Sequence, residues 1–143
     1  MNPFVLLRIG AVVAFLLFAG HSLGAPWAPG DDSAVSAVVG AMKAARVPEM
    51  GPDRSYWDLY FGFGVSVSIY LLALAVLLWQ TASLARSNFA DARPFMASLF
   101  ICYLAVAVVG FRYFFFLPAV MAGVVCLCIG LAWRIGSRRN NAD

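Results

Sequence analysis

The chain has 143 residues, of which 63% are hydrophobic and 12% are charged, whereas an ordinary soluble domain has about 25% charged residues. A chain this short cannot bury so much apolar surface in a core of its own, so the composition excludes an ordinary soluble domain and points to lipid as the solvent. The net charge is only +3, and no basic cluster is interleaved with aromatic residues, so we expect no nucleic acid among the partners.

Four stretches reach the roughly 20 apolar residues that a helix needs to cross a bilayer. They are residues 4–23, 59–80, 94–111 and 114–133. Short connections make the last three antiparallel neighbours, so the sequence predicts an all-α membrane protein, a four-helix transmembrane bundle with up-down-up-down topology. We expect one membrane domain over residues 1–136 and a short cytoplasmic tail over 137–143.

Two local features refine these spans. Arg8 is the one charge in the first span and lies near its end, where the side chain can reach lipid headgroups. Pro94 is placed in the first turn of the third span, where a missing N–H costs little. The best signal-peptidase site, Leu23-Gly24-Ala25 at the end of the first span, is followed by Pro26, which disfavours cleavage, so we expect this helix to stay in the protein.

The long polar loop after the first span has the pattern of an amphipathic helix over residues 33–46. Asp31 or Asp32 can cap it, and Lys43 and Arg46 complement its C-terminal dipole. Its apolar face follows the i, i+3, i+4, i+7 spacing and consists of Val35, Val38, Val39 and Met42. We expect this helix to lie on the membrane surface or over the outer end of the bundle.

Helices in lipid pack through small residues that let their backbones approach. Every span has small residues four apart. The pairs are Gly10 and Ala14 in the first, Gly62 and Ser66 with Gly64 and Ser68 in the second, Ser98 and Cys102 in the third, and Ala119 and Gly123 with Ala122, Cys126 and Gly130 in the fourth. Tyr70 and Tyr103 are the bulky hydroxyl residues near mid-span, and we expect them to hydrogen-bond across helices.

Basic residues set the expected orientation, because short loops rich in arginine and lysine stay in the cytoplasm. One side of the bundle would carry six basic residues, namely Arg8, Arg86, Arg93, Arg134, Arg138 and Arg139. The other side would carry four, namely Lys43, Arg46, Arg54 and Arg112. We therefore expect both termini in the cytoplasm and the first loop outside.

Polar side chains from three segments would meet at the external end of the bundle. His21 closes the first span, and Arg112 and Tyr113 occupy the turn between the last two. The second span opens with Arg54, Tyr56, Trp57, Asp58 and Tyr60. These eight residues are the candidate ligand-binding site, in which an amphiphile would place its headgroup among the cationic side chains and its tail between helices. In an enzyme, His21 and Asp58 would be the candidates for acid–base catalysis.

The same residues also have a structural interpretation. Ser55 followed three residues later by Asp58, before an apolar run, is typical of a capping box. The tyrosines and Trp57 lie where an aromatic belt meets the water–lipid boundary. The sequence leaves the two interpretations open.

The sequence disfavours a disulfide framework, a metal site, and ion or proton transport. Cys102, Cys126 and Cys128 all lie in apolar stretches, so no disulfide framework is expected, and their spacing does not suit a metal ion. No charged residue lies deep in a span, where ion or proton transport would need one. We expect neither a metal nor another cofactor.

The pattern Gly20-His21, Met42-Lys43, Arg54-Ser55-Tyr56-Trp57-Asp58 and Gly62-Phe63-Gly64 resembles a group of small, uncharacterised four-span bacterial membrane proteins, over the first half of the chain. The resemblance implies a multi-pass protein of the bacterial inner (cytoplasmic) membrane and no particular activity. The first span lacks the acidic residue of small multidrug exporters, and the chain lacks the Cys-x-x-Cys pair of quinone-reducing disulfide generators.

The sequence therefore favours a small inner-membrane protein that binds a lipid-like or quinone-like ligand, or a partner, at its external end. Two alternatives stay open: a membrane enzyme acting on a lipid or isoprenoid headgroup, which is less favoured, and a structural or assembly subunit of a membrane complex. The expected partners are membrane lipids, with a second copy of the chain or another membrane protein beside them.

Overall fold

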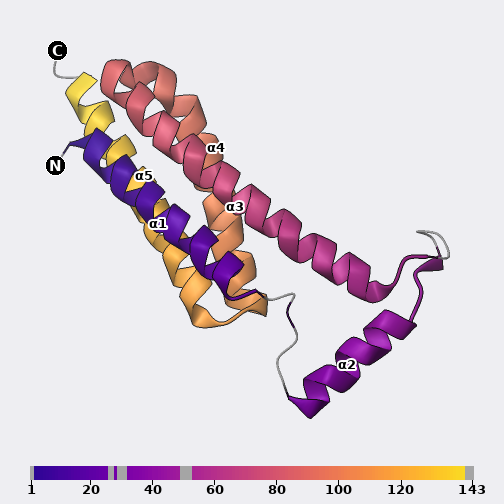
Figure 1. The fold of residues 1–143 in the computed structure, drawn as a ribbon. Helices are drawn as coiled ribbons and strands as arrows, with labels where there is room; N and C mark the ends of the chain where they lie inside the picture. The colour runs from indigo at the N-terminus through magenta and orange to yellow at the C-terminus, as the bar shows by residue number, and fades with distance from the viewer. Residues whose placement is uncertain (1, 26–27, 29–31, 49–52, 141–143) are drawn as a thin grey trace. The chain divides into compact units, whose positions relative to one another are not determined.

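The computed structural model describes residues 2–25, 28, 32–48 and 53–140. They form five α-helices in the order α1 (Pro3–Leu23), α2 (Ser33–Ala44), α3 (Tyr56–Ser87), α4 (Phe89–Tyr113) and α5 (Phe116–Asn140) (Figure 1). The all-α prediction is confirmed, and so is a shorter helix between the first two long ones. Four helices, all but α2, are long and apolar enough to cross a membrane.

The chain divides into two compact units, which are described separately below. The bundle unit consists of Met1–Ala19 and Leu71–Asp143 and contains segments of all four long helices. The loop unit is Gly20–Tyr70 and contains α2, the last turn of α1 and the first half of α3.

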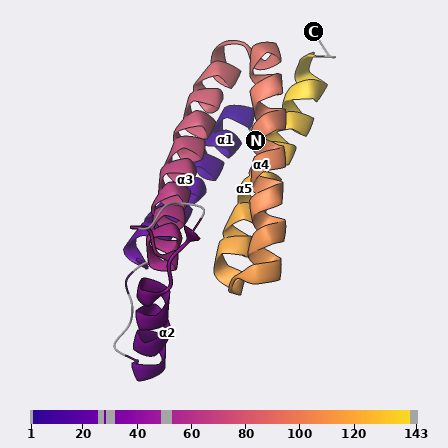
Figure 2. The same ribbon diagram turned by 90° about the vertical axis from the view of Figure 1, so that its right-hand side faces the viewer.

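In the bundle unit the helix segments run side by side with alternating direction (Figure 2). Arg8 near the start of α1 contacts Ser83 near the end of α3, so these two helices are antiparallel. Phe89 at the start of α4 lies against Gly136 near the end of α5, so these two are antiparallel as well. Since Asn88 alone separates α3 from α4, the predicted up-down-up-down order is confirmed for this unit.

The core of the bundle unit is a single seam of apolar residues contributed by all four segments. On α1 the buried positions recur every three or four residues, because only one stripe of a helix can face its neighbours. Residues exposed by less than 2% include Leu7, Leu78, Met96, Tyr103, Val125 and Ile129. The small residues Ala122 and Cys126 of α5 are buried in the same seam, as their spacing predicted.

Small residues do not all lie at helix contacts. A Cβ atom on Gly10 would be 3.2 Å from Cβ of Cys128, so α1 approaches α5 closely there. On α4, by contrast, Ser98 and Cys102 are exposed, and the packed face is built from Ala92, Met96, Leu99 and Tyr103. The hydroxyl of Tyr103 is buried without a hydrogen-bond partner, so the expected hydrogen bond across helices is wrong for this residue.

The outward surface of the bundle unit is strongly apolar. Phe111 and Phe114 to Phe116 are each exposed by 65 to 71% of their surface. A soluble monomer rarely leaves so large an apolar area in contact with water, whereas lipid is its natural solvent. The composition, the four long helices and this surface together identify a multi-pass membrane protein.

Local signals set the helix ends. The side chain of Asn88 accepts hydrogen bonds from the backbone N–H groups of Ala90 and Asp91, so α4 begins five residues before the predicted start at residue 94. Pro94 is consequently one turn further into the helix than predicted. At the other end α5 continues to Asn140, so residues 137–140 of the predicted tail are helical, and residues 141–143 lie outside the described part of the chain.

Candidate functional site

The start of α3 carries the capping box that the sequence predicted. Asp58 Oδ2 accepts hydrogen bonds from the backbone N–H of Ser55 at 2.8 Å and from its hydroxyl at 2.7 Å. The backbone N–H of Asp58 in turn lies 3.2 Å from Ser55 Oγ. Since both groups satisfy backbone donors that have no partner within the helix, this pair fixes where α3 begins.

His21 lies in the loop unit where the end of α1 contacts α3. Its Nε2 atom is 3.2 Å from the carbonyl oxygen of Gly64, and Ser22 Oγ donates to Ser68 Oγ at 3.0 Å. Gly64 and Ser68 are the small-residue pair predicted for close helix contact, and their size gives His21 and Ser22 room to reach α3. Gly64 lies six residues beyond Asp58, about 9 Å along the helix.

The contacts therefore separate the two residues proposed for acid–base catalysis. Asp58 Oδ2 is engaged by Ser55, and His21 Nε2 is engaged by the Gly64 carbonyl. The Asp58 contact caps the start of α3, and the His21 contact joins α1 to α3. Both contacts therefore support the structural interpretation of these two residues.

An antiparallel bridge between Arg46 and Ser55 ties the end of α2 to the start of α3. The backbone N–H of Val47 donates to the carbonyl of Arg54 at 3.0 Å, and that of Tyr56 donates to the carbonyl of Ala45 at 3.2 Å. Val47 and Ser55 are buried there, exposed by 7% and 4%. The bridge thus fixes the C-terminal end of α2 against α3.

Asp32 caps the other end of α2, because its Oδ1 atom accepts the backbone N–H of Ala34 at 2.7 Å. This selects Asp32 from the two predicted caps, while Asp31 lies outside the described residues. The helix ends at Ala44, two residues before the predicted end.

The apolar face of α2 and two aromatic residues of α3 line an open groove with a volume of about 410 Å³. Its walls include Val35, Val38, Val39 and Met42 of α2 with Trp57 and Tyr60 of α3. The rings of Trp57 and Tyr60 lie 5.7 Å apart. Lys43 Nζ is 5.3 Å from the Trp57 ring, within cation–π range, so one positive charge lies beside this apolar groove.

The remaining candidates of the loop unit lie at its surface. The side chains of Arg54 and Tyr56 are exposed, and their backbone groups take part in the two hydrogen bonds of the bridge. Of the six candidates in this unit, Trp57 and Tyr60 are brought together in the groove, while Asp58 faces Ser55 and His21 faces Gly64.

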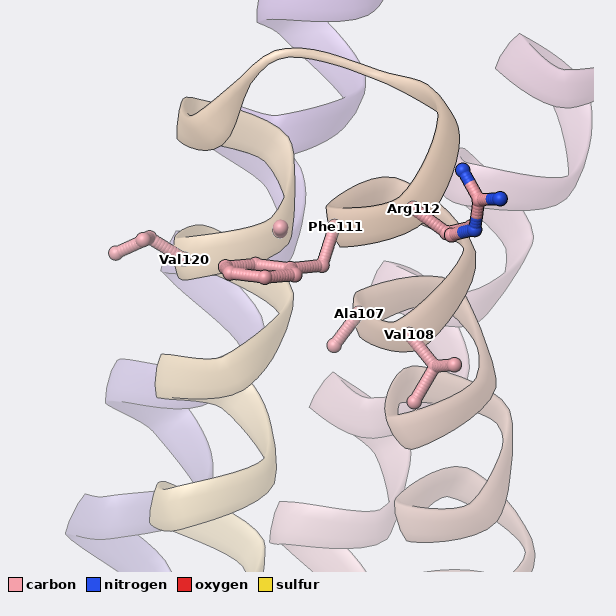
Figure 3. Close-up of a pocket in the computed structure, with 6 residues that line it drawn as sticks. Ala107, Val108, Phe111, Arg112 and Val120 are labelled. Atoms are coloured by element: carbon pink, nitrogen blue, oxygen red, sulfur yellow. The ribbon is translucent and has the colours of Figure 1, made fainter.

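Arg112 and Tyr113 belong to the bundle unit and form a separate local group at the end of α4. The Arg112 guanidinium carbon is 5.3 Å from the centre of the Tyr113 ring, and both side chains are exposed. Beside them is an open apolar pocket of about 480 Å³ between α4 and α5, lined by Ala107, Val108, Phe111, Arg112, Ala119 and Val120. Figure 3 shows Phe111 reaching toward Val120 while Arg112 is directed away from it.

The sequence missed the place of Lys43 and of the α2 face in this site. The face itself was visible in the spacing of the valines, but its partners on α3 are 15 or more residues further along the chain. A single bridge with two backbone hydrogen bonds brings them together, and so short a bridge has no periodic signal in the sequence. No family model, curated protein or solved structure matches this chain.

Proposed function

We propose that this protein is a small inner-membrane protein that binds an amphiphile in the groove between α2 and α3. The observation that carries the proposal is the groove itself, which is lined by five apolar residues of α2 together with Trp57 and Tyr60 of α3. Lys43 adds a positive charge at Trp57. Apolar walls with few polar groups are the usual design of a site for a small hydrophobic molecule.

The chemistry of the groove favours one class of ligand. A single apolar tail would cover the valines of α2, which are exposed by 42% at Val35 and 60% at Val38. A headgroup with negative charge or with carbonyl oxygens would lie at Lys43, because a cation beside an aromatic ring still has free N–H donors for such oxygens. Lipid-like and quinone-like molecules both meet this description.

A ligand in the groove would also explain why α2 has an apolar face that the protein does not bury. Because α2 buries none of its residues in the chain, its apolar face has to be covered by something other than the protein core. Lipid at the membrane surface would cover it in the same way as a bound tail, so the test has to distinguish a specific site from simple contact with the bilayer.

Tryptophan fluorescence can make that distinction. We would replace Trp27, Trp79 and Trp133 by phenylalanine, so that Trp57 alone reports, and reconstitute the protein with lipids brominated on the acyl chain. The proposal predicts saturable quenching at low molar ratios of brominated lipid, and native mass spectrometry should then detect one retained amphiphile.

A matched pair of substitutions on α2 tests the site directly. Val38 lines the groove, whereas Ala37 is exposed on the opposite face, so Val38→Asp and Ala37→Asp add the same charge to different faces. We expect Val38→Asp to abolish saturable quenching and Ala37→Asp to preserve it. Equal, non-saturating quenching in both variants would show that Trp57 only belongs to an aromatic belt, and the binding proposal would be abandoned.

A further inference from the structure

Two arginines and two aromatic rings form a cluster in the bundle unit, away from the residues that line the groove. The Arg8 cluster consists of Phe4 and Arg8 of α1 with Trp79, Ser83 and Arg86 of α3. The Arg8 guanidinium carbon is 3.5 Å from the centre of the Trp79 ring, and its Nη2 atom donates to Ser83 Oγ at 2.8 Å. The Phe4 ring centre is 5.1 Å from the guanidinium carbon of Arg8 and 5.4 Å from that of Arg86. One ring therefore contacts both cations.

Arg8 is only partly satisfied by these contacts. Its Nη1 atom is buried and has no hydrogen-bond partner. Arginine stays charged in proteins, so it cannot avoid this cost by losing a proton. A buried donor on a charged group without a partner is among the more costly features of a structure, and the charge of an anion bound beside the same guanidinium would offset part of that cost.

The protein itself supplies little negative charge to meet this need. Asp91 is the one acidic residue among those that the structure describes in the bundle unit. Its Oδ2 atom accepts a hydrogen bond from the side chain of Asn88 at 2.7 Å, next to the N-terminus of α4. Two arginines beside one ring, with no carboxylate of their own, make a site that favours a bound anion.

An apolar stripe continues from the cluster along both helices. On α1 the residues that follow Arg8 on the same face are Val12 and Phe15, each 50% exposed. On α3 the residues that precede Trp79 on its face are Val76 and Leu72, exposed by 46% and 37%. Since Arg8 contacts Trp79 and Ser83, the two stripes lie on the same side of the helix pair.

The arginines suit an anionic phospholipid headgroup, and the exposed apolar stripe beside them suits its acyl chains. Arg8 lies five residues into α1, about 8 Å along the helix, which is near the border where headgroups meet the hydrocarbon. We propose that Arg8, Ser83 and Arg86 bind the phosphate of an anionic phospholipid whose acyl chains lie along the α1–α3 stripe. Guanidinium groups suit this ligand because their paired N–H donors match two phosphate oxygens at once.

Native mass spectrometry of the detergent-purified chain would test the site, with phosphatidylglycerol and phosphatidylcholine as the probes. We expect one phosphatidylglycerol to bind more tightly than phosphatidylcholine. Arg86→Gln should weaken its binding about tenfold, the factor that corresponds to one charge-assisted hydrogen bond. Arg93 provides the matched control, because like Arg86 it lies beside an aromatic ring, 5.0 Å from the centre of Trp133, but outside the cluster. Arg93→Gln should leave the binding unchanged.

A second arginine variant and competition with inorganic phosphate test the same site. Arg8→Gln should weaken binding like Arg86→Gln, and if that variant does not fold, Arg86→Gln alone decides, because Arg86 is exposed. Excess inorganic phosphate should not displace the lipid; displacement would identify free phosphate as the ligand and overturn the lipid assignment. Equal losses in Arg86→Gln and Arg93→Gln would mean general attraction to a basic end, which would overturn the site.

Binding of phosphatidylglycerol at the Arg8 cluster should not depend on the groove between α2 and α3. Val38→Asp lies on α2 and should not change binding of phosphatidylglycerol at the Arg8 cluster. A variant pair that separates in this way would locate two lipid sites on the chain, while loss of phosphatidylglycerol in Val38→Asp would contradict the Arg8 cluster as its site.

Discussion

At the scale of single residues, the most unusual side chain is Tyr103. It is fully buried on the packed face of α4, and its hydroxyl has no hydrogen-bond partner. A hydroxyl left unsatisfied in an apolar core costs free energy that phenylalanine, with nearly the same shape, does not. The ring is therefore the part of this residue that stabilises the bundle.

We expect Tyr103→Phe to raise the free energy of unfolding by about 1 kcal/mol, since it removes an unsatisfied hydroxyl without opening a cavity. Thermal unfolding in detergent, followed by circular dichroism, would measure the change. Tyr70→Phe is the control, because Tyr70 is 67% exposed and should tolerate the change. Loss of stability in Tyr103→Phe would show that the hydroxyl is satisfied in solution.

At the scale of helices, the close approach of α4 and α5 depends on glycine. A Cβ atom on Gly136 would overlap the ring of Phe89, whereas one on Gly123 of the same helix would meet nothing within 4 Å. At Gly110 the nearest atom would be the Cα atom of Ala119 at 3.3 Å, so the same pair of helices is also close at its other end. At Gly110 the missing side chain lets the two backbones approach, and at Gly136 it makes room for the Phe89 ring.

Gly136→Ala should therefore destabilise the bundle by about 1 to 3 kcal/mol, the usual cost of overpacking. Gly123→Ala should leave stability unchanged or raise it, because alanine favours a helix over glycine. Both effects can be read from the same thermal unfolding assay. Adding Phe89→Leu to Gly136→Ala should recover part of the loss; no recovery would mean that the clash with Phe89 is not the cause.

The helices show which features a sequence can predict. Runs of about 20 apolar residues identify spans well, because crossing the bilayer imposes a minimum length. They do not identify the ends, since α3 extends past the predicted residue 80 to Ser87 and α4 begins at Phe89. Polar residues such as Thr81 can continue a helix, because its hydroxyl donates to the Leu77 carbonyl one turn earlier at 2.8 Å, so the composition changes before the helix stops.

The candidate site was predictable only in its local parts. The capping box of Ser55 and Asp58 is a contact over three residues, and the sequence contains the whole of it. The contact of Lys43 with Trp57 and that of His21 with Gly64 join residues 14 and 43 positions apart, on different helices. Such pairs depend on how helices meet, which periodicity within one helix does not specify.

At the scale of the whole molecule, the central expectation is orientation. The basic residues Arg8, Arg86, Arg93, Arg134 and Arg138 lie on the ends of the four spans that meet in the bundle unit. The rule that arginine and lysine remain inside places this end in the cytoplasm. The orientation stays a prediction, and so does the bacterial inner membrane as the location.

Cysteine accessibility would test it in a variant whose native cysteines are replaced by alanine or serine. Gly40→Cys is suitable, because Gly40 is exposed on α2 and a Cβ atom there would meet nothing within 4 Å. We expect an impermeant thiol reagent to label Gly40→Cys from outside the cell and Ser87→Cys only after the membrane is opened. The reverse pattern would invert the topology and the expected location of the groove.

The bridge between Arg46 and Ser55 has a consequence for how the groove between α2 and α3 would fill. Among the described backbone hydrogen bonds, those that join α2 to α3 all lie at this one end, beside Lys43 and Trp57. Two walls joined at one end can part only by pivoting, so the gap widens with distance from the pivot. We expect the groove to tolerate bulk near Ala34 and to reject it near Lys43. A tail branched close to its headgroup would then fit less well than a straight one.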